Sequence, residues 1–259
     1  MKYYHLIILF LVLGACIAQK EEDLQKLDVE VDNKSTSSQK DTLISAEAVV
    51  DTVEMLDTLE QRIINAGLVD VEIINANIWV DLKYSTTDNF LATNLYGVLT
   101  KAYLQEDIAL RLAKVQDSLS AIDSTLHLLV YDAVRPRSVQ WKMWRALDSL
   151  PVAQRIKFVS NPRNGSVHNY GCAVDLTICR ADSVPLDMGA NFDDLRKIAY
   201  PKYEKDFLKS GELSDVQLEN RLLLRKVMRY GGFWVLSTEW WHFNGLSRDA
   251  AKAKYKAIE

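Results

Sequence analysis

Apolar residues recur three and four positions apart in several stretches of the chain, and this periodicity predicts helices. The stretches run from Ser45 to Ala66, Ala102 to Ile122, Ser138 to Leu147 and Leu218 to Met228. Glycines follow the first and the last stretch, as is typical where a helix ends. We therefore expect helices over these ranges.

Other stretches alternate or are continuously apolar and rich in β-branched residues, which predicts strands. They are Val69 to Leu82, with one or two strands, Leu126 to Tyr131, Ala173 to Ile178, and Phe233 to Phe243. Helices and strands are mixed without a regular βαβ alternation. The pattern therefore favours an α+β fold, with a mostly antiparallel sheet flanked by helices in a single domain over residues 68–259.

The amino-terminal segment is typical of an exported protein. Lys2 precedes an apolar run from Leu6 to Ala18, which is shorter than the about 20 residues that cross a bilayer. Residues 1–18 are therefore predicted to be a signal peptide. Leu13 to Cys16 resembles a lipobox, in which the cysteine is lipidated, whereas ordinary cleavage after Ala18 is the alternative.

Residues 19–44 are polar and nearly free of aromatic residues, which predicts a disordered tether, and a helix over 45–67 follows it. The expected location is the cell envelope, either in the periplasm or anchored to the outer membrane. The net charge is −4, so nothing indicates a nucleic-acid partner. Contact with a membrane is expected only through the possible lipid at Cys16.

Two histidines and one aspartate form the chemical centre of the sequence. His168 and Asp175 flank Gly171, and His242 follows much later. Two imidazoles and one carboxylate complete the protein ligand set of a catalytic zinc, which keeps a fourth position for water or substrate. The alternative is a loop histidine, a capping aspartate and a core histidine. The other two histidines lie in an apolar leader and on a predicted strand.

Glu239 and Arg135 are the candidate catalytic residues. Glu239 precedes His242 by three positions and can serve as a general base, provided that the strand bulges or ends at Trp240 and Trp241. Arg135 ends a buried strand and can stabilise an oxyanion. The alternatives are a rim residue for Glu239 and a surface turn for Arg135.

Cys172 and Cys179 flank one predicted strand. Seven residues of extended chain separate them by about 23 Å, which is too far for a disulfide. Both are therefore expected to be buried free thiols. A role for Cys172 as a metal ligand beside His168 is the alternative.

Six ordered blocks of sequence resemble the D-alanyl-D-alanine dipeptidase family, the zinc metallopeptidases of the VanX type. The resemblance spans about residues 68–247. The blocks are Asp81 to Tyr84, Asp88 to Phe90, Tyr131 to Pro136, Ser166 to Thr177, Met188 to Asp193, and Glu239 to Phe243.

The resemblance implies one zinc ion per chain and hydrolysis of the dipeptide D-Ala-D-Ala to two D-alanines. It implies that His168, Asp175 and His242 are the zinc ligands, with Glu239 as base and Arg135 stabilising the transition state. It also implies that the ammonium end of the substrate is held by Asp193, Ser166 and Tyr84. Helix capping for Asp193, and packing or turn formation for the other two, are the alternatives.

The chain departs from this family in two ways. Val134 stands where the family more often has an aromatic residue, and the exported start differs from the family's cytoplasmic resistance enzymes. An exported enzyme favours turnover or scavenging of dipeptides from the cell wall over antibiotic resistance. The alternatives are a zinc D,D-carboxypeptidase acting on peptidoglycan peptides and a non-catalytic envelope-binding lipoprotein.

Overall fold

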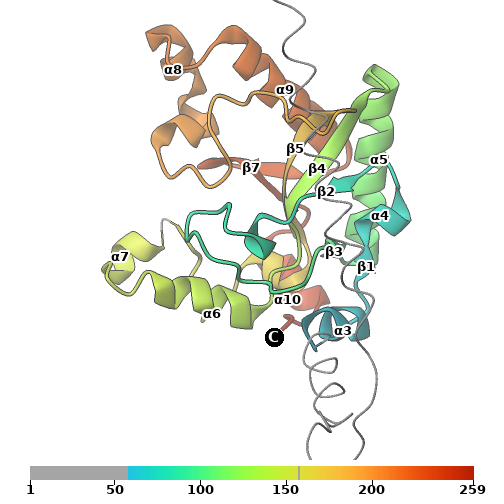
Figure 1. The fold of residues 1–259 in the computed structure, drawn as a ribbon, viewed down its shortest axis with the longest axis vertical. Coiled ribbons are helices and arrows are strands. Elements are labelled where there is room, and N and C mark those ends of the chain that lie inside the picture. The colour runs from blue at the N-terminus through green and yellow to red at the C-terminus, as the bar shows by residue number, and fades with distance from the viewer. Residues whose placement is uncertain (1–57, 157) are drawn as a thin grey trace, which may run out of the picture. The chain divides into compact units, whose positions relative to one another are not determined.

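A five-stranded sheet organises the part of the chain that the computed structural model describes, residues 58–156 and 158–259 (Figure 1). β4 pairs in parallel with β2, whereas the other neighbours are antiparallel. The strands, in spatial order, are β2 (Trp79–Val80), β4 (Leu126–Asp132), β5 (Ala173–Arg180), β7 (Glu239–Asn244) and β6 (Trp234–Leu236). The predicted α+β fold with a mostly antiparallel sheet is confirmed.

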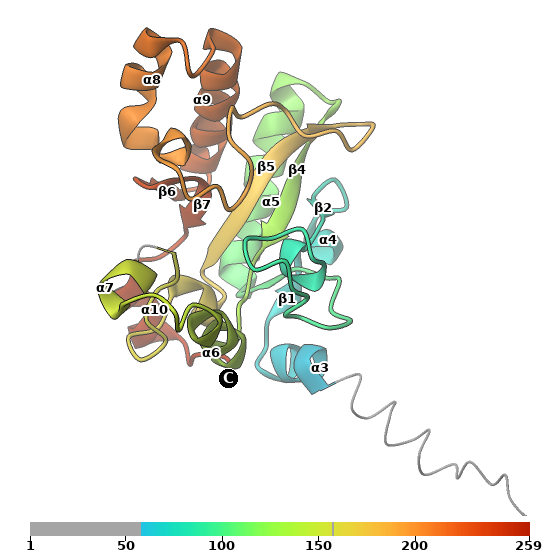
Figure 2. The same cartoon turned by 60° about the vertical axis from the view of Figure 1, so that its left-hand side comes forward.

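One face of the sheet is covered by α5 (Glu106–Ile122), which packs against β4 and against α9 (Asp215–Tyr230). Figure 2 shows α5 behind the two long strands. Apolar residues three and four positions apart on α5 are fully buried, as its periodicity predicts: Ile108, Leu112, Val115 and Leu119. The side chains of Asp175 and Thr177 lie on the other face of β5, since residues two apart on a strand point to the same side.

The remaining elements are short. α6, α7 and α10 gather at one end of the sheet, and α8 lies beside α9 at the other (Figures 1 and 2). They are α3 (Thr58–Asn65), β1 (Val69–Asp70), α4 (Val71–Ile74), β3 (Tyr103–Leu104), α6 (Arg137–Ala146), α7 (Val152–Arg155), α8 (Glu204–Ser210), α10 (Arg248–Lys254), and the 3₁₀ turns η1 (Lys83–Ser85), η2 (Val167–Tyr170), η3 (Lys197–Ala199) and η4 (Pro201–Tyr203).

The signal peptide, Cys16, the tether and most of the helix predicted from Ser45 lie outside the described residues. The division of the chain at residues 18, 44 and 67 therefore stays a prediction. Within the described ranges, no helix has the length and apolar character needed to cross a membrane.

Two predicted elements were wrong in part. The segment Val69 to Leu82 contains the helical turn α4, because the Asp70 carboxylate accepts from the amide of Glu72 and caps it. The helix predicted from Ala102 begins at Glu106. The residues before it form β3, which pairs with β1.

The two cysteines are buried and free, as predicted. The sulfur of Cys172 lies 3.3 Å from the Tyr170 carbonyl oxygen, and burial raises the pKa of this thiol to about 12. Both features describe an inert core thiol.

Gly171 makes the turn that connects η2 to β5. Its φ is +63°, and a Cβ placed there would lie 2.7 Å from a methyl group of Leu68. Since a side chain is disfavoured both by this φ and by this contact, the turn requires glycine. The turn sets the position of η2 relative to the start of β5.

We expect Gly171→Ala to lower the free energy of unfolding by more than Gly211→Ala, measured by urea denaturation. Gly211 also has a positive φ, +79°, but nothing lies within 4 Å of the position that a Cβ would take there. Gly211→Ala should therefore cost about 1–2 kcal/mol from the backbone alone. Overpacking should add about 1–3 kcal/mol at Gly171. Equal losses in the two variants would contradict this account of the turn.

Candidate metal centre

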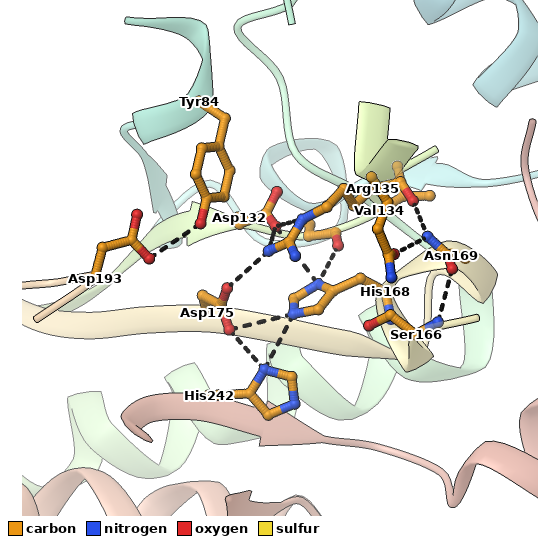
Figure 3. Close-up of polar contacts among 12 residues, drawn as sticks. Tyr84, Asp132, Val134, Arg135, Ser166, His168, Asn169, Asp175, Asp193 and His242 are labelled. Atoms are coloured by element: carbon orange, nitrogen blue, oxygen red, sulfur yellow. Dashed lines mark hydrogen bonds and ion pairs between the residues drawn. The ribbon is translucent and has the colours of Figure 1, made fainter. Parts of the chain in front are cut away.

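Three side chains predicted as ligands converge on the open face of the sheet (Figure 3). Asp175 on β5 lies opposite His242 on β7, and His168 comes from η2 just before β5. His242 Nδ1 lies 2.9 Å from Asp175 Oδ1 and 3.1 Å from His168 Nε2, and the third side of this triangle measures 3.3 Å. The structure thus brings the predicted ligand set together.

Hydrogen bonds on the far side of each ring determine which nitrogens face the triangle. His168 Nδ1 lies 2.6 Å from the Ala133 carbonyl oxygen, and His242 Nε2 lies 3.1 Å from Asn244 Oδ1. Both partners are acceptors, so each of these nitrogens carries a hydrogen. The two facing nitrogens and the Asp175 oxygen are then left to share a proton or a metal cation between them.

The dimensions fit a small divalent cation. Zinc–nitrogen bonds of about 2.0–2.1 Å in a tetrahedron place neighbouring ligand atoms about 3.3 Å apart. The observed separations are 2.9–3.3 Å. Two imidazoles and a carboxylate are a ligand set that suits zinc, and all three side chains are buried. Cys172 does not belong to this group.

The electrostatics of the triangle also favour positive charge at its centre. Burial alone would raise the pKa of Asp175, but the His168 and His242 rings hold that pKa well below its usual range. Burial lowers the pKa of His242, but the hydrogen bond to Asp175 outweighs burial and raises this pKa to about 9, so a proton is held between the two groups when no metal ion is bound. The three groups therefore attract a cation strongly.

Arg135 and Asp132 lie directly behind the triangle. The Arg135 guanidinium donates to Asp132 Oδ2 at 2.5 and 2.9 Å and to Asp175 Oδ2 at 3.4 Å. Burial lowers the pKa of Arg135, but Asp132 raises it well above its usual value. The arginine is thus fixed as a cation at the edge of the site.

Asp132 belongs to the candidate site, although it was not singled out from the sequence. It is fully buried, accepts from the Tyr96 hydroxyl at 2.5 Å, and lies 3.7 Å from His168 Nδ1. A bulge after Val130 sets Asp132 opposite Asp175 on the neighbouring strand. An aspartate that ends an otherwise apolar strand, three positions before Arg135, was the available signal.

Glu239 enters the same pocket as the triangle, with its Oε2 3.8 Å from His242 Nδ1. The register between β6 and β7 shifts sharply here, since Val235 pairs with Phe243 but Leu236 pairs with Glu239. The predicted break in the regular strand at the tryptophans is therefore confirmed. Burial raises the pKa of Glu239 above its ordinary value.

The pocket has a volume of about 320 Å³, and the predicted substrate-binding residues line it. The Tyr84 hydroxyl donates to Asp193 Oδ1 at 3.0 Å, and burial raises the pKa of Asp193 to about 7. Ser166 caps η2, with its hydroxyl accepting from the His168 amide at 3.4 Å. Val134 is buried in the core and does not line the pocket.

A family model and several known proteins are similar to the chain in sequence. A family model described as D-ala-D-ala dipeptidase matches residues 64–257. The chain is 35% identical over 177 residues to the D-alanyl-D-alanine dipeptidase of Escherichia coli K12, covering 68% of this chain and 83% of that protein. It is 28% identical over 186 residues to the protein of the same name from Enterococcus faecalis, covering 66% and 87%.

Among solved structures, the chain is similar to a mutant of the vancomycin resistance D,D-pentapeptidase VanY in complex with Zn(II). The sequence identity is 16% and the TM-score is 0.30. The match covers 59% of this chain and 78% of that one.

We expect Asn244→Ala to weaken zinc affinity about ten- to hundredfold, because the His242 ring then loses the partner that fixes its tautomer. A titration against a chromophoric chelator measures this. Asn220→Ala is the control, since within the described part of the chain the half-buried Asn220 amide donates to the Asp187 carbonyl oxygen alone, at 2.8 Å. An unchanged affinity in Asn244→Ala would show that the hydrogen bond plays no part in metal binding.

Proposed function

This chain belongs to the D-ala-D-ala dipeptidase family of peptidases, and we propose that it is a zinc-dependent enzyme that hydrolyses D-Ala-D-Ala to two D-alanines. The observation that carries the proposal is the meeting of three acceptor atoms within about 3 Å of one another, with Glu239 beside them. We propose one zinc ion per chain, held by His168, Asp175 and His242.

Zinc bound there supplies a Lewis acid, which polarises a carbonyl group and makes water nucleophilic at neutral pH. The protein's own contribution is to orient the two imidazole rings. Ala133 and Asn244 do this through the far ring nitrogens. Three protein ligands would leave one coordination position of the zinc open toward the pocket, for water or substrate.

Glu239 is positioned to act as general base and acid. Its carboxylate lies 3.8 Å from His242 Nδ1 and lines the pocket, so it can take a proton from the attacking water. The same carboxyl group can then deliver that proton to the leaving amine. Its half-buried position keeps it near both reacting groups while isolating the proton from bulk solvent.

Arg135 supplies a fixed positive charge where the carbonyl oxygen becomes negative. The Arg135 guanidinium is held by the Asp132 carboxylate. Its central carbon, Cζ, lies 5.0 Å from the centre of the Tyr84 ring. Because these contacts hold the group before substrate arrives, little reorganisation is needed during the reaction. We assign Arg135 to transition-state stabilisation on this basis.

Asp193 and Tyr84 form the end of the pocket that we assign to the substrate's ammonium group. Asp193 accepts from the Tyr84 hydroxyl and, at 3.4 Å, from the Phe90 amide, which orients its carboxylate. A carboxylate in a small pocket favours a free amine over an acylated one, because an acylated nitrogen carries no compensating charge. Ser166 lines the same pocket from the start of η2, on the far side of the triangle from Asp193, and we assign it to substrate binding there.

We also propose a place in the cell envelope, with turnover or scavenging of wall-derived dipeptides as the physiological role. The support is the apolar run from Leu6 to Ala18, with the lipobox-like Leu13 to Cys16 within it, and the polar stretch after it. Export would separate the enzyme from cytoplasmic dipeptide pools.

We expect the purified protein to hydrolyse D-Ala-D-Ala, to lose this activity with a chelator, and to regain it with Zn²⁺. Glu239→Gln should lower kcat by about 10²–10⁴-fold, because the carboxyl group no longer accepts a proton. Release of D-alanine measures both effects. Glu219→Gln, an exposed substitution on α9, should leave kcat unchanged.

Comparison of D-Ala-D-Ala with N-acetyl-D-Ala-D-Ala separates the proposal from its alternatives. Equal rates on both would favour a carboxypeptidase. Chelator-insensitive turnover, or full activity in Glu239→Gln, would remove the proposed mechanism.

We expect the chain, expressed in bacteria with its own amino terminus, to partition into detergent with the membrane proteins. Cys16→Ser should move it to the aqueous phase, since the thiol would be the site of lipid attachment. Immunoblotting of the two phases measures the effect. Recovery of the unaltered protein from the cytosol would contradict both the export and the anchor.

A further inference from the structure

A second and larger cavity adjoins the pocket of the metal centre. Its volume is about 730 Å³, against about 320 Å³ for the pocket itself. Both lie over the same face of β5, since Asp175 lines the pocket and Thr177 lines the second cavity. Residues two apart on a strand are separated by about 6.6 Å, so the two spaces are close neighbours.

The wall between the two spaces is thin. Phe90, Asp193 and Asp194 line both of them. The Phe192 ring lines the second cavity and is part of this wall. Its centre lies 5.9 Å from that of Tyr84 and 5.5 Å from that of Trp241, two rings that line the pocket.

The second cavity is polar enough to receive a peptide. Its lining includes Lys83, Asp187, Asn191 and Arg196. Thr177 is fully buried, and its hydroxyl has no hydrogen-bond partner among the described residues. A buried hydroxyl without a partner is costly, so it points to a polar group that binds there.

We propose that Phe192 determines substrate length, and that the cavity behind it can bind the amino-terminal extension of peptides that end in D-Ala-D-Ala. This rests on the proposed function, which places the substrate's ammonium group at Asp193. Asp193 belongs to the wall that the two spaces share. A group attached to the substrate's amino nitrogen would therefore point toward Phe192. In the native chain the ring closes this direction and keeps the pocket the size of a dipeptide.

Two obstacles therefore act against an extended substrate. The Phe192 ring blocks its path, and the Asp193 carboxylate loses the positive charge that would compensate it. Removing only the second obstacle should not admit a longer peptide, whereas removing the ring should. The two effects can be separated by substituting each residue alone and both together.

The experiment compares Phe192→Ala, Asp193→Asn and the double variant on D-Ala-D-Ala and on N-acetyl-D-Ala-D-Ala. We expect Phe192→Ala to raise the ratio of kcat/KM for the acetylated over the free dipeptide at least tenfold. The double variant should raise it further. Asp193→Asn alone should lose activity on the free dipeptide without gaining any on the acetylated one.

A binding measurement gives a second readout. In the Glu239→Gln background, calorimetry should show tighter binding of N-acetyl-D-Ala-D-Ala when Phe192 is alanine. Phe207→Ala is the matched control, because that half-buried ring on α8 packs against Tyr203 and lines neither space. It should leave the substrate ratio unchanged.

If a Phe192→Ala variant still hydrolyses the free dipeptide but its kcat/KM ratio for the two substrates is unchanged, this inference is overturned and the proposed function stands. A native enzyme that already cleaves both substrates equally would also overturn the inference. If the native enzyme hydrolyses neither, the proposed function fails and takes the inference with it. If Phe192→Ala does not fold, the smaller change Phe192→Leu is judged by the same ratio.

Discussion

The structure depends on three hydrogen-bond acceptors that face one another in a buried place. Without a positive charge between them, His168, Asp175 and His242 would repel, and burial would strengthen the repulsion. The fold nevertheless holds them together through the pairing of β5 with β7 and the glycine turn before β5. Binding of the proposed cation would offset the free-energy cost of this arrangement and so couple folding to metal binding.

Irregular strand pairing shapes the chemistry of the site. In regular strands, residues three apart point to opposite faces, so Glu239 and His242 could not share a pocket. The shift of register between β6 and β7 removes this restriction. The bulge between Val130 and Asp132 does the same on the other side of β5, where it sets two carboxylates opposite each other. Arg135 makes that pairing tolerable by binding to both.

The size of the pocket follows from aromatic packing. The Phe192 ring packs edge to face against the rings of Tyr84 and Trp241, which line the pocket together with Asp193. In the proposed function, this packing lets the Asp193 carboxylate select a free amine by charge while the rings exclude longer substrates by shape. Recognition and chemistry would then use separate parts of the site, with Arg135 in contact with both.

The sequence by itself determined the α+β class, the two central strands, the helices α5, α6 and α9, and the residues that converge on the metal centre. These follow from local periodicity and from side-chain chemistry, which a sequence displays directly. Only the tertiary structure decided the position of Asp132, the orientation of the two histidine rings and the packing of Phe192 against Tyr84 and Trp241. Each of these depends on contacts between segments far apart in the chain, such as the row that joins residues 132, 175 and 242 across three strands. Strand register sets such contacts, and no local pattern encodes it.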